Sequence, residues 1–258
     1  TRNIIEGIYE DSDSQIIFVD TPGIHKPINK LGNILNKKAY STSENVDLIL
    51  FLVDIEAGIG KGDMFVLEKL KEENLPIILV LNKVDRVNKD KLLELIMKYK
   101  DLYDFSEIFP ISALKNDNVN ALVKTIKKYL PNEGKIFESD MFTNISTNFY
   151  ISEIIREKVL RKTREEVPHS VTCVVEKRID NKDKEIIQAC IIVDRESIKK
   201  IIVGKNASML KSIGMQARID LEEYFGKKVY LELFVKVIKN WREKEKYLKE
   251  LGLDDLEN

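Results

Sequence analysis

The first half of the chain contains four short, almost continuously apolar runs. In chain order they are residues 16–19, 48–53, 77–81 and 108–111. Each run is too short for a buried helix and none alternates with polar residues, so the pattern predicts parallel strands covered on both faces. The helical patterns between and after them are residues 64–73, 91–103 and 120–130. Alternating strands and helices predict a doubly wound α/β domain.

The second half of the chain has a different order of elements. A helical pattern at 152–161 precedes two strand candidates at 171–177 and 186–193, which are joined by a polar turn at 181–184. The last predicted elements are a short helix ending near Gly204, a longer helix at 208–225 and an alternating strand at 229–237. The order α-β-β-α-α-β predicts a smaller α+β domain.

The segment Pro131-Asn132-Glu133-Gly134 separates the two halves because it interrupts the preceding helical pattern. We therefore expect a first domain over 1–131, a polar linker over 132–147 and a second domain over 148–240. The remaining residues, 241–258, are rich in charge and predict a solvated terminal helix. At its start, Trp241 is interpreted first as a packing anchor.

Composition fits a globular protein of one or two domains, with 43% apolar and 33% charged residues among 258. Lys plus Arg number 42 and Asp plus Glu 43, so only local clusters of charge can indicate a partner. Cys173 and Cys190 lie in apolar runs, which predicts buried thiols in a reducing cytoplasm and no metal site. The apolar runs are far shorter than the ~20 residues that span a bilayer, so we expect neither a membrane span nor a signal peptide.

Three polar motifs follow predicted strands of the first half. They are Asp20-Thr21-Pro22-Gly23, Asn82-Lys83-Val84-Asp85 and Ser112-Ala113-Leu114-Lys115. In open α/β sheets ligands bind outside the carboxyl ends of strands, where these motifs would converge. Any one of them alone is also found in ordinary turns and loops. The ordered set, with helix-sized gaps between its members, is specific for a guanine nucleotide site.

The first motif suits the phosphate end of such a nucleotide. Asp20 can hold Mg²⁺ through a water molecule, and the N–H of Gly23 can approach a γ-phosphate because glycine has no Cβ. Thr21 and Pro22 lie between these two residues and complete the predicted site.

The second and third motifs suit the base. An ionised Asp85 can accept hydrogen bonds from the ring N–H and the amine of guanine, whereas adenine has no donor at the equivalent ring nitrogen. The stem of Lys83 can cover the base, and Asn82 can tie the loop together. After the next strand come Ser112 and Ala113, and the N–H of Ala113 could contact the guanine carbonyl.

A basic cluster with a glycine loop lies in the second half. From 195 to 218 there are six Lys or Arg and one acid, Glu196. A loop between two helices that approaches a nucleic acid backbone needs small residues and neighbouring cations. The alternative is that these charges only solvate two amphipathic helices. The residues that carry this pattern are Gly204, Lys205, Asn206, Ala207, Lys211 and Arg218.

The motifs DTPG, NKVD and SALK resemble the third, fourth and fifth motifs of translation-factor-type GTPases. DTPGIH followed by a KH-like half resembles the bacterial Era family over essentially the whole chain. The resemblance implies a P-loop NTPase-like G domain followed by a type II KH domain. It also implies GTP or GDP with Mg²⁺ as cofactors, and GTP hydrolysis by the complete protein.

The same resemblance implies a partner and a cellular role. The KH domain would bind 16S ribosomal RNA near its 3′ end, and the protein would act in assembly of the small ribosomal subunit. The RNA-binding residues that the resemblance implies are Gly204, Lys205, Asn206, Ala207, Lys211 and Arg218. Stacking on RNA is the alternative to packing for Trp241. We expect a cytoplasmic monomer, and the resemblance leaves open a peripheral contact with the inner face of the cell membrane.

Ala207 stands where the KH loop G-x-x-G has its second glycine. Because it precedes a predicted helix directly, we expect Ala207 to have a negative φ and no strain.

Two further features depart from a complete, Ras-like GTPase. The sequence contains no phosphate loop G-x-x-x-x-G-K-[ST], and Thr1-Arg2 resembles the end of a switch I segment. We therefore expect the phosphate loop to lie upstream and this chain alone to be inactive. Ile24 stands where Ras-like enzymes have a water-orienting Gln. We expect a structural or partner-facing role for His25, with substitution for that Gln as the alternative. The rival hypothesis is a non-enzymatic RNA-binding module whose α/β domain is a nucleotide-free docking platform.

Overall fold

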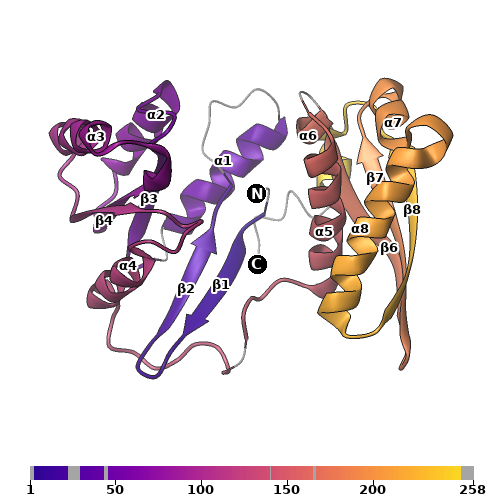
Figure 1. Ribbon diagram of the computed structural model, residues 1–258, viewed down its shortest axis with the longest axis horizontal. Coiled ribbons are helices and arrows are strands. Elements are labelled where there is room, and N and C mark those ends of the chain that lie inside the picture. Colours follow the sequence, from indigo (N-terminus) through magenta and orange to yellow (C-terminus); the bar gives the residue numbers. More distant parts are fainter. Residues whose placement is uncertain (1–2, 23–29, 44–45, 140, 165–166, 251–258) are drawn as a thin grey trace. The chain divides into compact units, whose positions relative to one another are not determined.

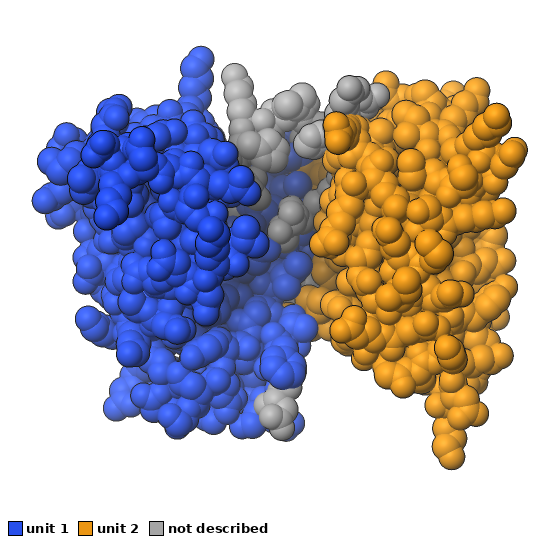
Figure 2. Space-filling model, viewed as in Figure 1, with its two compact units in different colours: residues 1–28, 32–143 blue, residues 29–31, 144–258 orange. Residues whose placement is uncertain are grey.

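The computed structural model describes the chain except residues 1–2, 23–29, 44–45, 140, 165–166 and 251–258. Two compact units are present, residues 1–28 with 32–143 and residues 29–31 with 144–258 (Figure 2). The predicted linker, 132–147, therefore begins in the first unit and ends in the second.

The first unit contains a three-stranded parallel sheet in the order β3–β4–β5 (Figure 1). Its strands are β3 (Ile49–Asp54), β4 (Ile77–Asn82) and β5 (Glu107–Ile111). The longer helices of this unit are α1 (Lys30–Ser43), α2 (Lys61–Leu70), α3 (Lys89–Leu102) and α4 (Val119–Ile126). The short 3-10 helices are η1 (Val84–Arg86) and η2 (Lys127–Tyr129). Three of the four predicted strands are thus confirmed as parallel neighbours.

Strand β4 is buried on both faces. Its odd-numbered residues Ile77, Leu79 and Leu81 pack with side chains of α2 and α3. Its even-numbered residues Ile78 and Val80 pack with side chains of α4. None of the five is more than 1% exposed. This double coverage explains the uninterrupted apolar run and confirms the doubly wound architecture.

The fourth predicted strand has a different partner. Strand β2 (Gln15–Asp20) pairs antiparallel with β1 (Ile5–Glu10) in a separate two-stranded sheet. The expectation of a parallel strand at 16–19 was therefore wrong. An apolar run reports burial, and Ile16 is indeed buried against the α4 side of the core, but burial does not specify the direction of a neighbour. The turn is fixed by Asp11, whose Oδ1 accepts from the N–H groups of Asp13 and Ser14.

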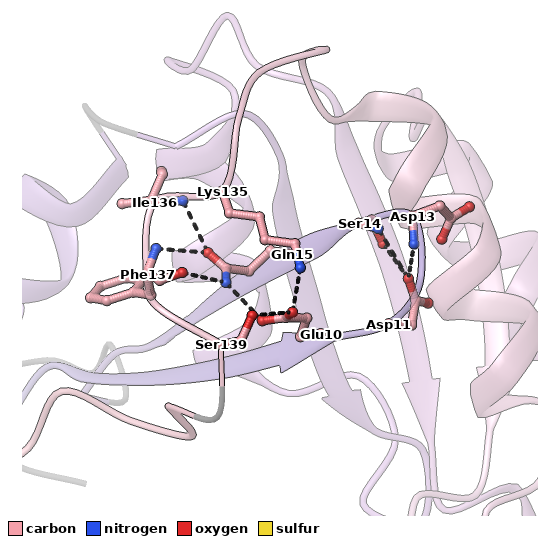
Figure 3. A network of polar contacts seen from close by, with 9 residues as sticks. All are labelled: Glu10, Asp11, Asp13, Ser14, Gln15, Lys135, Ile136, Phe137 and Ser139. Atoms are coloured by element: carbon pink, nitrogen blue, oxygen red, sulfur yellow. Dashed lines mark hydrogen bonds and ion pairs between the residues drawn. The ribbon is translucent and has the colours of Figure 1, made fainter.

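The chain after η2 is held on this hairpin by side chains (Figure 3). The Gln15 Oε1 accepts from the N–H groups of Ile136 at 3.1 Å and Phe137 at 2.9 Å, and Gln15 Nε2 donates to the Phe137 carbonyl at 3.0 Å. Glu10, beside Gln15, forms an ion pair with Lys135. The start of the predicted polar linker is therefore ordered against β1 and β2.

The second unit contains the sheet β6–β7–β8 (Figure 1). Its strands are β6 (Val171–Asp180), β7 (Lys184–Val193) and β8 (Lys228–Val237). Its helices are α5 (Thr147–Lys162), α6 (Val167–Ser170), α7 (Glu196–Val203), α8 (Ser208–Phe225) and α9 (Glu245–Glu250), with the 3-10 helices η3 (Lys205–Ala207) and η4 (Trp241–Glu243). Strands β6 and β7 are antiparallel, and β7 and β8 are parallel. Side chains of α5, α7 and α8 share one apolar core with alternate residues of the sheet, which confirms the predicted α-β-β-α-α-β order.

The segment after β8 is less solvated than its composition indicates. Trp241 and Leu248 are both fully buried. The indole Nε1 of Trp241 donates to the Ser170 carbonyl at 3.1 Å, so the packing role of this residue is confirmed. The expectation of a solvated tail was wrong at Trp241 and Leu248, which anchor the segment, whereas residues 243–246 between them are exposed.

Cys173 and Cys190 are buried free thiols, as predicted, and burial raises the pKa of both. Within the described ranges of the chain, no helix is both long and apolar enough to cross a bilayer.

Candidate functional site

The loops after β4 and β5 are joined by Asn82. The register pairs Asn82 with Ile111, so both loops leave the same edge of the sheet. Asn82 Oδ1 accepts from the N–H of Lys83 at 2.8 Å and from the N–H of Ala113 at 3.1 Å. Asn82 therefore ties the loop together, as its side chain was expected to do. The Ala113 N–H, which the sequence assigned to the guanine carbonyl, is engaged by Asn82 in this structure.

Asp85 is held in the loop after β4 by Ser112. The Ser112 Oγ donates to Asp85 Oδ1 at 2.6 Å, and this hydrogen bond is the main reason that the pKa of Asp85 lies below its ordinary value. Ser112 is itself fixed, because its N–H and carbonyl exchange hydrogen bonds with Asp117 at 3.1 and 3.0 Å. The other carboxylate oxygen, Oδ2, is 3.6 Å from Arg86 Nε. The site thus presents an ionised, positioned carboxylate, which suits the paired N–H donors of guanine.

Lys83 is positioned by Asp54, which belongs to none of the three sequence motifs. The Lys83 backbone is left-handed, with φ of 72°, and its Nζ lies 2.5 Å from Asp54 Oδ2. Asp54 ends β3 directly opposite Asn82 in the register, and its other oxygen accepts from the N–H of Glu56. The ion pair raises the pKa of Lys83 and lowers that of Asp54. The sequence signal that could have identified Asp54 is an acidic residue at the end of a buried strand, at the edge of the sheet where the other motifs lie.

The motif of residues 20–23, which the sequence assigns to the phosphate end of the nucleotide, begins at the end of β2 in the two-stranded sheet. Asp20 is the last residue of β2 and is exposed, Thr21 is partly buried and Pro22 is buried. Gly23 lies outside the described residues, as do Ile24 and His25.

The fit of a metal ion can be judged from Asp20. Among the described residues, no group of three or more His, Cys, Asp or Glu side chains is placed so that it could hold a metal ion by itself. A single exposed carboxylate nevertheless fits Mg²⁺, which is commonly bound through one or two carboxylates together with waters and phosphates.

The loop between α7 and α8 has a backbone that few residues adopt. Gly204 has φ of 70°, and a Cβ there would lie 2.8 Å from the Cβ of Met209, so glycine is required. Asn206 and Ala207 follow with φ of 51° and 59°. The expected negative φ at Ala207 was wrong. The chain turns through two left-handed residues before α8 begins, and Ala in this region costs about 1 kcal/mol.

The predicted RNA-binding cations lie on this loop and along α8. Lys205, Lys211 and Arg218 are all exposed. Lys211 and Arg218 are seven residues apart and so share one face of α8, about 10 Å apart along its axis. The opposite face, with Ile213 and Ala217, is in the core. The structure therefore presents a glycine-dependent loop with a line of positive charge leading away from it.

Comparison with known proteins assigns the two domains that carry these sites to a single protein family. The model of the elongation factor Tu GTP-binding domain matches residues 1–132, and the KH domain model matches residues 166–242. The GTPase Era of Clostridium kluyveri is 47% identical over 253 residues, which cover 98% of this chain and 86% of that protein. This chain belongs to the Era family. The resemblance carried by DTPGIH, NKVD and SALK is thereby confirmed.

Solved Era structures have the same fold as this chain. A crystal structure of Era in complex with MgGDPNP and nucleotides 1506–1542 of 16S ribosomal RNA matches with a TM-score of 0.95 and 39% identity, covering 98% of this chain and 87% of that one. An Aquifex aeolicus Era variant bound to GDP·AlF₄⁻ matches with a TM-score of 0.93, 39% identity and the same coverage. The predicted G domain followed by a type II KH domain is confirmed.

The Ser112–Asp85 hydrogen bond predicts a pH-dependent effect of Ser112→Ala. Guanine binding through Asp85, as predicted from the sequence, would require the ionised carboxylate, and the lowered pKa of Asp85 preserves this charge as the pH falls. Removing the Ser112 hydroxyl lets the pKa of Asp85 rise. As the pH is lowered, the affinity for GDP should therefore begin to fall at a higher pH in the variant than in the parent protein. At neutral pH we expect roughly tenfold weaker GDP binding, as for loss of one hydrogen bond to a charged group.

The measurement is calorimetric titration of GDP from pH 4 to 8, on the protein extended by the phosphate-loop segment of its family. Ser106→Ala, just before the opposite end of β5, is the matched control and should change nothing. If Ser112→Ala changes neither the GDP affinity at neutral pH nor the pH at which this affinity falls, the hydroxyl does not position Asp85.

Proposed function

We propose that this Era-family chain is the greater part of a GTP-dependent RNA-binding factor that hydrolyses GTP and acts in assembly of the small ribosomal subunit. The observation that carries the proposal is the close match to an Era structure that holds both MgGDPNP and 16S ribosomal RNA nucleotides. The local geometry supports it, because each of the two ligands would meet a preformed site of suitable chemistry.

Guanine selection would rest on the two loops tied by Asn82. The carboxylate of Asp85 would accept hydrogen bonds from the ring N–H and the amine of the base. Adenine would leave this carboxylate without a donor, which typically costs ~1–3 kcal/mol or more. The Lys83 stem, held at its end by Asp54, would lie along one face of the base.

The residues near the phosphates would bind Mg²⁺ and sense the γ-phosphate. They would not activate the attacking water. Asp20 would hold a water of Mg²⁺, and the ion would neutralise charge on the phosphates when bound. Gly23 would approach the γ-phosphate. The sequence has Ile24 after this glycine and contains no phosphate loop. In this proposal the chain therefore supplies base selection and γ-phosphate sensing.

The RNA would lie across the loop between α7 and α8. Gly204 permits close approach of a sugar-phosphate backbone, and the Lys205, Lys211 and Arg218 cations would contact phosphates. The small-subunit RNA of the matched Era structure indicates the RNA class. The protein is proposed to work as a cytoplasmic monomer, with a peripheral membrane contact as an extension of the same proposal.

The base-selection proposal predicts the effect of Asp85→Asn. GTP and GDP affinity should fall by tenfold or more, because an amide presents a donor to the guanine amine. Affinity for xanthine nucleotides should rise, since xanthine has a carbonyl at that position. Competition titrations with GDP, XDP and ADP on the phosphate-loop-containing protein measure this, with Asp90→Asn on α3 as the control. Equal affinities of the parent for ADP and GDP would defeat the proposal and favour a nucleotide-free docking domain.

The RNA proposal predicts opposite effects of substitutions within one loop. Lys205→Ala should weaken single-stranded RNA binding and reduce the salt slope by about one unit if the side chain contacts one phosphate. Ala207→Asp should weaken it further, because a carboxylate would face phosphates. Ala207→Gly should bind equally or up to about fivefold more tightly, since glycine relieves the left-handed φ.

RNA titrations at several salt concentrations, on variants shown to be folded, provide the measurement. Lys124→Ala on α4 removes an exposed charge elsewhere and should be neutral. If Lys205→Ala and Ala207→Asp both bind RNA like the parent, the loop is not the RNA site.

A further inference from the structure

The outer face of the β6–β7–β8 sheet has a composition unlike an ordinary solvated surface. Along β8, Val229, Leu231 and Leu233 point into the core shared with the helices. The alternate side chains therefore point to the other face. They are Lys228, Tyr230, Glu232, Phe234 and Lys236.

Two aromatic side chains on this face are left in solvent. Tyr230 is 60% exposed and Phe234 is 45% exposed. Tyr230 is not isolated, because the register places it opposite Ile186, and Ile186 opposite Ile179, which is 37% exposed. An aromatic residue on a strand is ordinary by itself, since aromatics favour strands. A connected apolar row that ends in an exposed tyrosine is more typical of a binding surface.

Lysines border the apolar row. Lys184 and Lys228 are register partners next to the Ile186–Tyr230 pair, and Lys236 lies beyond Phe234. All three are exposed, and in the described part of the chain none of their ammonium groups forms a salt bridge.

Acidic groups offset these cations only in part. Glu232 accepts from Gln188 Nε2 at 2.8 Å, and Glu176 stands at the β-bulge of β6. A chain with a formal charge of −1 thus carries a locally basic, aromatic sheet face.

The spacing of these groups fits a single-stranded nucleic acid. Tyr230 and Phe234 are about 13 Å apart along β8, and each has a lysine on the side away from the other. Proteins bind unpaired strands with this combination, since bases stack on aromatic rings while cations follow the phosphates. Strand β8 is an edge of the sheet, and α7 packs against it on the inner face. An RNA strand could therefore pass from the α7–α8 loop around this edge.

We propose that the outer sheet face, formed by Ile179, Ile186, Tyr230 and Phe234 with the bordering lysines Lys184, Lys228 and Lys236, is a second contact surface for single-stranded RNA. Bases stack on Tyr230 and Phe234, while Lys184, Lys228 and Lys236 lie beside phosphates. The inference rests on the proposed RNA-binding function and extends the bound segment beyond the α7–α8 loop.

The test compares two nested single-stranded RNAs with a shared core taken from nucleotides 1506–1542 of 16S ribosomal RNA. One has about 5 nucleotides, close to what a KH loop clamps, and the other about 15. Tyr230→Ala and Phe234→Ala should each weaken binding of the longer RNA at least fivefold, as typical for loss of one stacked base. Binding of the shorter RNA should not change, and Tyr230→Phe should retain the affinity of the parent. Leu93→Ala, a 60% exposed residue of α3, is the matched control.

A direct probe comes from Tyr230→Trp. The chain has one tryptophan, the buried Trp241, so the introduced indole reports on the outer sheet face. Its fluorescence should be quenched by the longer RNA, whereas that of Leu93→Trp should not. Unchanged affinity of the alanine variants without quenching overturns the inference. So does a change in self-association by sedimentation with RNA affinity intact, which would make this face an interface between copies.

The failure of this inference is distinguishable from failure of the proposed function. If Lys205→Ala weakens both RNAs but the outer-face variants weaken neither, only the second surface is rejected. If Lys205→Ala and Ala207→Asp leave both RNAs unaffected, the proposed KH loop site itself is rejected.

Discussion

The burial of β4 on both faces is the constraint on which the candidate nucleotide site depends. Residues 77–81 are enclosed between the α2–α3 layer and α4, with almost no exposed surface. A strand fixed in this way has a fixed end, and Asn82 is the first residue that leaves the core. Because β3 and β5 are its parallel neighbours, Asp54 and Ser112 arrive at the same edge. The polar chemistry of the loops is therefore positioned by apolar packing behind it.

The second unit uses its core in a comparable way. Three helices cover one face of the sheet, and the α7–α8 connection projects from this layer as a short loop with successive positive φ angles at Asn206 and Ala207. Such a backbone persists only where the surrounding structure holds it, and strained loops are common at ligand sites. The helices that hold the loop leave the other sheet face uncovered around Tyr230, so one packing arrangement creates both proposed RNA surfaces.

Much of the fold could be predicted because burial leaves a direct trace in the sequence. The uninterrupted run 77–81 predicted a doubly covered strand, and the 3.6-residue pattern of 208–225 predicted α8 with the bounds observed. Strand direction leaves no such trace, so β2 was placed in the wrong sheet. A negative φ was expected at Ala207 because the residue before a helix is usually extended or helical, whereas the chain here turns through the left-handed residues Asn206 and Ala207.

The candidate site was predictable where a motif has a fixed spacing and less so where contacts come from distant elements. The Asn82–Ala113 and Ser112–Asp85 hydrogen bonds join residues about 30 positions apart, yet both partners belonged to known motifs. Asp54 belonged to none, and only the sheet register brings it to Lys83. Leu248 shows the same limit in reverse, because its charged surroundings concealed a buried anchor, whereas the packing of Trp241 could be predicted.

In the proposed function, one chain carries a guanine site at the end of β4 and a separate RNA site at the α7–α8 loop. Backbone amide NMR with two titrations tests it most directly. Millimolar GDP with Mg²⁺ should shift the amides of Lys83, Asp85 and Ala113, and ADP should not. Single-stranded RNA should shift those of Gly204 to Ala207 and leave the first set unchanged. GDP and ADP spectra that coincide, or RNA shifts confined to the first unit, would contradict the account.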